Sequence, residues 1–171
     1  MNKRGHVLNA VLLALGLGVI LAVSPTSEPT MATARAAATA IAELSLPVVL
    51  GALFPDVDTA FGRHRKTLHS LPVLAVFLAF PFYFGNLEYV WVGVATHYVL
   101  DVVGSRRGIA LFHPFSDREY DLPTGVATSS RWANPVTLAV TAVELGALAL
   151  VHYHVVALDA GLQQATAAFG L

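Results

Sequence analysis

The chain has 171 residues, a length that fits one domain, and 56% of them are hydrophobic whereas only 12% are charged. Soluble domains carry about 25% charged residues, so this composition, with a mean hydropathy of +0.64, indicates a membrane protein. A net charge of −1 supplies no basic surface for nucleic acid. The chain has no cysteine, which excludes disulfides, thiolate metal sites and cysteine nucleophiles. Any metal would therefore be bound by His, Asp or Glu.

Five apolar segments follow one another along the chain, and we expect each to form a helix. They cover residues 7–23, 31–54, 71–84, 87–103 and 135–158, and a loop with seven charged residues, 104–134, precedes the last. The first segment is apolar except for Asn9 and has the length of one membrane span. With its basic start and the small residues after it, this segment also fits a cleaved signal peptide. The prediction is an all-α fold: a single domain over residues 1–171, built as a polytopic membrane bundle of about five helices.

The basic residues favour one orientation of this bundle. Nine of the ten Lys and Arg residues fall before the first segment, between the second and third, or between the fourth and fifth. Only Arg35 falls on the other side. Because positive charge accumulates on the cytoplasmic side of membrane proteins, we expect a multi-pass protein of the cell membrane with a cytoplasmic N-terminus.

The potential metal ligands fall at the same ends of the predicted helices. They are His6, Asp56, Asp58, His64, His69, His97 and Asp101. Oxygen and imidazole ligands so close to long apolar segments predict a shared metal site at the cytoplasmic helix ends.

Each pair within this set also has a simpler interpretation. His97 and Asp101 are one helical turn apart and share a face, which suits metal binding and equally a helix-end ion pair. Asp56 and Asp58 follow Pro55 and point different ways in an extended or turn backbone, so one can bind metal while the other orients a histidine; a helix-capping turn is the alternative.

His64 and His69 are five residues apart, which separates them widely on a helix. We therefore place His64 in the loop and His69 at the start of the third helix. Arg65 and Lys66 between them are candidates to hold a phosphate, or are inside-facing charges that only set the topology.

A few further polar residues have expected roles. Ser70 is expected to cap the third helix, with a hydrogen bond to a metal ligand as the alternative. Glu43 and Glu144 lie inside apolar segments, where an unpaired charge is costly, so each is expected near the metal site or facing Arg131 or a serine in the bundle interior.

Five motifs, in this order, resemble the YdjM/DUF457 family of membrane-bound, metal-dependent hydrolases. They read GHVLN (5–9), GALFPDVD (51–58), HRKTLHS (64–70), HYVLD (97–101) and GIALFHPF (108–115). The resemblance covers roughly residues 1–116, and the segment FPDVDTAFGRHRKTLHSLP is most similar to archaeal members.

The resemblance implies a hydrolase with two or three divalent ions, zinc above all. A metal-activated water would then attack a phosphoester, and a membrane lipid is the natural substrate class at this location. Asp56 or Asp58 would act as general base or bridging ligand, and Arg65 or Lys66 would hold phosphate. The alternative is a membrane protein that binds metal without catalysis, as a transporter or a scaffold. No G-x-S-x-G, P-loop or dinucleotide motif is present, and the sequence leaves the oligomeric state open.

Overall fold

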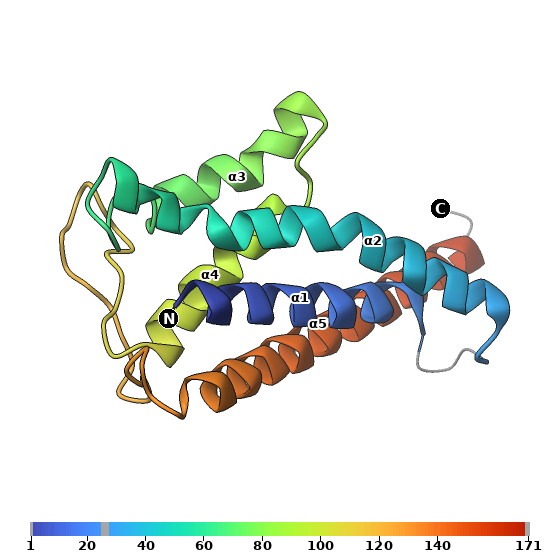
Figure 1. Ribbon diagram of the computed structural model, residues 1–171. Helices are drawn as coiled ribbons and strands as arrows, with labels where there is room; N and C mark the ends of the chain where they lie inside the picture. The colour runs from blue at the N-terminus through green and yellow to red at the C-terminus, as the bar shows by residue number, and fades with distance from the viewer. Residues whose placement is uncertain (1, 25–27, 170–171) are drawn as a thin grey trace.

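A computed structural model describes residues 2–24 and 28–169 as an all-helical bundle (Figure 1). Its helices are α1 (Lys3–Ala22), α2 (Met31–Leu53), the 3-10 helix η1 (Pro55–Ala60), α3 (Leu71–Phe84), α4 (Val90–Gly104) and α5 (Ala133–Phe169). No β-strand occurs in the described part of the chain; two isolated bridges, Ser105 with Val126 and Ile109 with Tyr120, hold the loop before α5. The predicted fold class, an all-α membrane bundle of five helices, is confirmed.

Successive helices run in opposite directions, so their ends form two groups (Figure 1). The start of α1, the end of α2, the start of α3, the end of α4 and the start of α5 lie at one end of the bundle. The loop between α4 and α5 covers this end. The segments that carry the predicted ligands are therefore neighbours.

Three helical segments are long and apolar enough to cross a membrane, namely Lys3–Ala22, Met31–Ala60 and Ala133–Val155. The other two apolar helices, α3 and α4, are shorter, with 14 and 15 residues. α4 is enclosed by α1, α2 and α5, whereas α3 packs mainly on α4 and diverges from the bundle (Figure 1). Many large apolar side chains on the outer faces remain exposed, as lipid-facing surfaces require.

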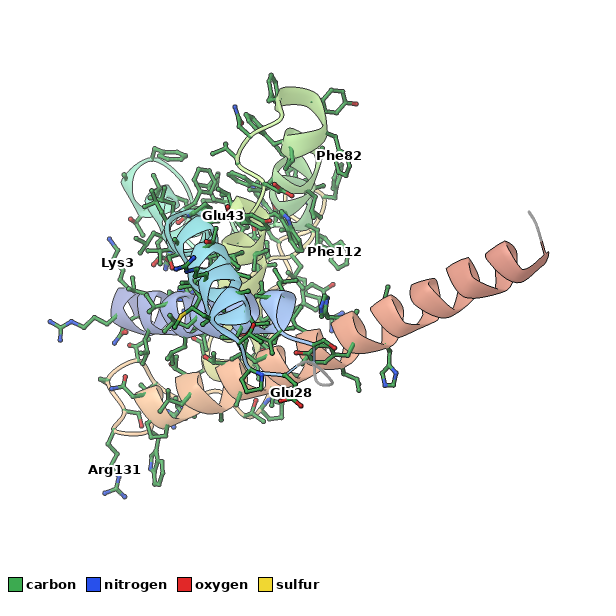
Figure 2. All side chains as sticks on the ribbon, turned by 90° about the vertical axis from the view of Figure 1, so that its right-hand side faces the viewer. Lys3, Glu28, Glu43, Phe82, Phe112 and Arg131 are labelled. Atoms are coloured by element: carbon green, nitrogen blue, oxygen red, sulfur yellow. The ribbon has the colours of Figure 1, made fainter. Side chains whose placement is uncertain are left out.

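Local signals account for most helix ends. The Asn2 side chain accepts a hydrogen bond from the Gly5 backbone N–H, so α1 begins at Lys3, four residues before the predicted start. Pro72 in the first turn and Gly85, in the left-handed conformation (φ 64°), delimit α3 at the predicted residues. Ser70 occupies the N-cap position of α3 but makes no capping hydrogen bond, so the prediction that it caps this helix is wrong. α5 continues beyond the predicted end at residue 158 and projects from the bundle (Figure 2).

Glycines bring α2 and α4 into close contact where they cross. A Cβ atom added to Gly51 would lie 3.0 Å from the Val90 carbonyl carbon, and one added to Gly93 would lie 2.6 Å from the Ala52 amide nitrogen. Small residues at such crossings are typical of helix packing in membranes. The close approach brings the Ala52 carbonyl next to the last two turns of α4, where His97 lies.

Candidate metal centre

Six of the seven predicted ligands form two groups at this end of the bundle. His6 on α1 joins His97 and Asp101 on α4, and Asp56 on η1 joins His64 and His69 from the loop before α3. Within each group, one ligand atom from each residue lies within 4.8 Å of the others. Four separate pieces of chain thus deliver imidazoles and carboxylates to a common place, and each group can hold a metal ion.

The tautomer of His97 follows from a backbone contact. Its Nδ1 lies 2.7 Å from the carbonyl oxygen of Ala52 and must donate a hydrogen to it. In the neutral ring the proton is then on Nδ1, and Nε2 carries a free lone pair. A backbone carbonyl that orients a histidine in this way is typical of metal-binding sites.

Asp58 orients His64 and His69 in a similar way, by accepting hydrogen bonds from their ring N–H groups. Its Oδ2 lies 3.0 Å from His69 Nδ1 and its Oδ1 lies 2.9 Å from His64 Nδ1. The Leu68 backbone N–H also donates to Oδ2, at 3.4 Å, and the carboxylate is fully buried. Both oxygens of Asp58 are therefore engaged in orienting imidazoles, and Nε2 of His69 is left with a lone pair.

In these neutral tautomers the lone pairs of His69 and His97 face each other with no hydrogen between them. His69 Nε2 and His97 Nε2 are 3.1 Å apart. Asp56 Oδ1 lies 3.8 Å from each of them, and Asp101 Oδ2 lies 3.8 Å from His69 Nε2 and 3.6 Å from His97 Nε2. Four acceptors this close repel one another unless a cation lies among them. Ligands about 2.0 Å from a tetrahedral zinc ion would be about 3.3 Å apart, so the separations suit atoms that bind one ion or two neighbouring ions.

A charged His69 is an alternative cation, and burial opposes it. Burial lowers the pKa of His69 to about 4, the neighbouring His97 adds to this effect, and the nearby Asp58 only partly offsets it. His69 is therefore neutral at physiological pH.

His6 has no hydrogen-bond partner among the described residues. Its side chain is 1% exposed, and neither ring nitrogen makes a hydrogen bond. Nε2 lies 3.5 Å from Asp101 Oδ1, and the ring stacks on His97 with centroids 3.7 Å apart. A buried polar group normally has a partner, and a metal ion shared with His97 and Asp101 would supply one for His6.

The two basic candidates for phosphate binding lie in different environments. Arg65, in the left-handed conformation (φ 68°), is buried, and its guanidinium donates to the carbonyl oxygens of Arg107 and Gly108 and to Ser105 Oγ. It also lies 3.7 Å from Asp101 Oδ1. Arg65 thus fastens the loop before α5 to the metal centre, a role that the sequence did not indicate.

Lys66 is partly exposed and faces Asp117. Its Nζ is 3.5 Å from Asp117 Oδ1. His113, which the GIALFHPF motif contains, also faces Asp117, at 3.2 Å, and therefore lies outside the metal cluster.

Glu144 does not have the expected partner. It faces the interior, but it bonds Asn9 and Thr96 instead of Arg131 or a serine. The one polar residue in the first apolar segment, Asn9, was the available signal for this contact.

Fold and site together define a class: an all-helical membrane protein with a buried His/Asp cluster able to hold metal. The chain belongs to the YdjM family, since it matches the family described as YdjM inner membrane protein over residues 1–163. The match extends past the motif-bearing residues 1–116 into α5. Neither the curated proteins nor the solved structures contain a match to this chain.

Proposed function

We propose that this chain is a membrane-bound, metal-dependent hydrolase that cleaves a phosphoester. The observation that carries the proposal is the convergence of the Nε2 atoms of His69 and His97, 3.1 Å apart, with two carboxylates around them. Such a set is costly to bury without a cation. An arrangement of this kind at the polar end of a membrane bundle suits hydrolysis at the bilayer surface.

The two groups of ligands support a pair of neighbouring divalent ions. His6, His97 and Asp101 would hold one, and Asp56, His64 and His69 the other. Imidazole and carboxylate ligands without thiolate favour zinc. When bound, such ions lower the pKa of a water to about 7 and stabilise negative charge on a phosphoryl oxygen.

Residues of the protein would orient the metal ligands and accept the proton from the attacking water. Asp58 and the Ala52 carbonyl orient the imidazoles, because their oxygens are occupied by ring N–H groups. Asp56, whose side chain is 11% exposed, is the carboxylate left to accept a proton from the attacking water or to bridge the ions. The geometry thus favours Asp56 over Asp58 as the base.

The open side of the cluster indicates where substrate would enter. His64 is 39% exposed and Lys66, two residues further along the same loop, is partly exposed, whereas Arg65 is turned inward. We assign the phosphate contact to Lys66 and not to Arg65. Because the polar end of a membrane-spanning bundle would lie at the level of the lipid head groups, a lipid phosphoester is the substrate class we propose. The bias of basic residues toward this end supports a cytoplasmic N-terminus.

Hydrolysis by the purified full-length protein tests the proposal. A soluble phosphodiester, bis-p-nitrophenyl phosphate, and phospholipid vesicles would each be assayed with added zinc and with chelator. We expect metal-dependent turnover that is lost in His97→Ala and retained in His152→Ala, a histidine of α5 outside the cluster. Bound metal with no turnover on either substrate would refute the hydrolase and favour the scaffold or transporter.

A further inference from the structure

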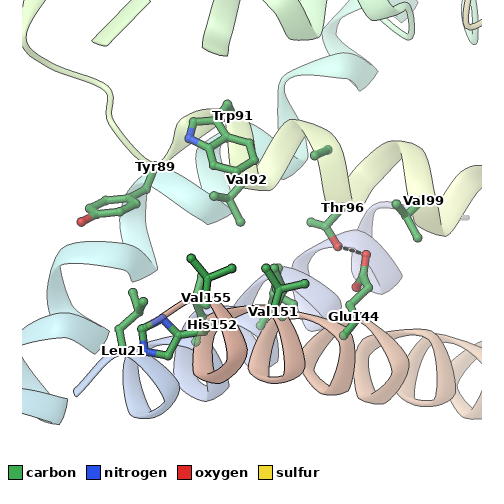
Figure 3. A pocket seen from close by; sticks show the side chains of 15 residues that line it. Leu21, Tyr89, Trp91, Val92, Thr96, Val99, Glu144, Val151, His152 and Val155 are labelled. Carbon is green, nitrogen blue, oxygen red and sulfur yellow. Dashed lines mark hydrogen bonds between the residues drawn. The ribbon is translucent and has the colours of Figure 1, made fainter. Parts of the chain in front are cut away.

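A large apolar cavity lies between α1, α4 and α5 (Figure 3). Its volume is about 610 Å³, and aliphatic side chains make up most of its wall. Two of its lining residues, Glu144 and Thr96, are hydrogen-bonded to each other, and Tyr89 and His152 lie at the opposite end of the cavity (Figure 3). Glu144 is a titratable group inside a candidate membrane span, and it has no role in the proposed metal chemistry.

Glu144 belongs to a closed set of hydrogen bonds that joins three helices. Its Oε1 lies 2.7 Å from Thr96 Oγ1 on α4, and its Oε2 lies 2.8 Å from Asn9 Nδ2 on α1. Asn9 Oδ1 lies 2.6 Å from Thr96 Oγ1, and Asn9 Nδ2 also lies 2.9 Å from Thr141 Oγ1. The hydroxyl of Thr141 is already directed to the carbonyl oxygen of Thr137, at 2.8 Å.

If Glu144 is ionised, these contacts require one more hydrogen than the side chains in the set can supply. The Thr96 hydroxyl has one hydrogen, yet its oxygen lies within hydrogen-bonding distance of two acceptors, Asn9 Oδ1 and Glu144 Oε1. If Oε1 carries a proton, the acid donates to Thr96 and Thr96 donates to Asn9. The two amide hydrogens of Asn9 then serve Thr141 and Oε2, and every contact is satisfied.

The other orientation of the Asn9 amide gives the same result. Because the oxygen and nitrogen of an amide are assigned from their surroundings, the two atoms can be exchanged. The Asn9 nitrogen then donates to Thr96, and Thr96 donates to Glu144 Oε1. The Asn9 oxygen, however, now faces Glu144 Oε2 at 2.8 Å, and two acceptors at that distance again require a proton on Glu144.

The surroundings of Glu144 provide no positive charge that could replace this proton. No ion pair joins Glu144 to a basic side chain within residues 2–24 and 28–155. The titratable residues that share the cavity wall are Tyr89 and His152. An ionised carboxylate without a cationic partner is expensive in a membrane, whereas the acid form has a partner for its hydrogen.

We propose that Glu144 holds a proton, and that this neutral carboxylic acid is a proton-binding and modifiable site separate from the metal centre. Thr96 directly precedes His97, and Asn9 follows His6 by one helical turn. The hydrogen bonds that this proton completes therefore link α5 to α1 and α4, the two helices that carry the first group of metal ligands. Its loss would leave two acceptors in contact and a charge beside an apolar cavity.

The acid should react with a hydrophobic carbodiimide that enters the cavity from the bilayer. In this reaction the carboxyl proton moves to a carbodiimide nitrogen, and the carboxyl oxygen bonds to the central carbon to give an O-acylisourea. Migration of the acyl group from oxygen to nitrogen gives a stable N-acylurea, so the adduct is a simple sum of the two reactants. An ionised carboxylate lacks the proton that the first step uses.

Infrared difference spectroscopy between the wild-type protein and Glu144→Gln tests the protonation state. Glutamine offers an N–H in place of the acid O–H and so preserves the packing. The wild-type protein at neutral pH should show the carbonyl stretch of a protonated acid that Glu144→Gln lacks and the matched Glu43→Gln retains. Loss of carboxylate bands instead would overturn the proposal.

Labelling provides a second test that does not depend on a variant. The wild-type protein in lipid vesicles would be treated with dicyclohexylcarbodiimide, and the adducts mapped by peptide mass spectrometry. We expect an adduct on Glu144, formed equally with and without a metal chelator. An unmodified Glu144 after prolonged treatment would contradict the proposal, whatever the outcome for the hydrolase.

Discussion

Adding one methyl group at the crossing of α2 and α4 should disturb the metal centre. The Cβ of Gly93→Ala would lie 2.6 Å from the Ala52 amide nitrogen and would also clash with the Val48 carbonyl oxygen, so backbone has to move. Ordinary contacts are about 3.5 Å or more, which requires α2 and α4 to separate by about 1 Å. Overpacking of this kind costs about 1–3 kcal/mol.

The displacement reaches the metal ligands through one hydrogen bond. His97 Nδ1 lies 2.7 Å from the Ala52 carbonyl oxygen, and a separation of about 1 Å would break this contact. Losing the group that orients a ligating histidine lowers metal affinity by about 10–100-fold. We therefore expect Gly93→Ala to bind metal 10–100-fold more weakly than the wild-type protein, as measured by competition with a fluorescent chelator.

Gly146→Ala is the matched control. An added Cβ there has nothing within 4 Å, and alanine favours a helix by about 1 kcal/mol over glycine. This variant should bind metal normally and melt no earlier than the wild-type protein in detergent. If Gly93→Ala kept wild-type metal affinity, the inference that the helix crossing positions His97 would be refuted.

Three further predictions follow from the same contacts. Asp58→Asn should lower metal affinity by about 10–100-fold, because an amide cannot accept from two ring N–H groups with both of its polar atoms; isothermal titration would measure it. Arg65→Gln should lower the free energy of unfolding by about 3–5 kcal/mol, since it leaves buried carbonyls and a carboxylate without their cation; an unchanged unfolding midpoint in denaturant would contradict this. The hydrogen bond from Arg107 lowers the pKa of Glu119 from its ordinary value of 4.5, so this pair stabilises the fold above about pH 4.5 and the benefit disappears as the pH falls further. The melting temperatures of wild-type protein and Arg107→Ala should therefore differ at neutral pH and converge in acid, and a difference that grows in acid would show the sign to be wrong.

The apolar composition of the segments, together with proline and glycine residues at their ends, was enough to predict the helices. Apolar runs fixed their number and order, and Pro72 and Gly85 marked both ends of α3. The length of α5 was underestimated because no proline or glycine-rich turn follows residue 158 to end the helix there. The start of α1 was missed because the decisive contact, Asn2 with the Gly5 N–H, is a side-chain cap that hydropathy does not register.

The candidate site could be predicted as a set of residues but not as a geometry. The alternation of helix direction places His6, Asp56, His69 and Asp101 at one end, and this follows from counting segments. What each polar group contacts depends on how separate segments meet. Asp58 spans two imidazoles because the loop after η1 folds back, and Arg65 turns inward because the loop before α5 presents carbonyl oxygens to it. Neither contact can be inferred from the spacing of residues in the sequence.

The metal content of the purified protein tests the central claim most directly. Elemental analysis of full-length protein exposed to zinc and then dialysed should find about two divalent ions per chain in wild-type protein and in His152→Ala. His69→Ala, which removes a ligand of the second group, should retain no more than about half of that metal. Wild-type protein without stoichiometric metal, or His69→Ala with the full amount, would contradict the account.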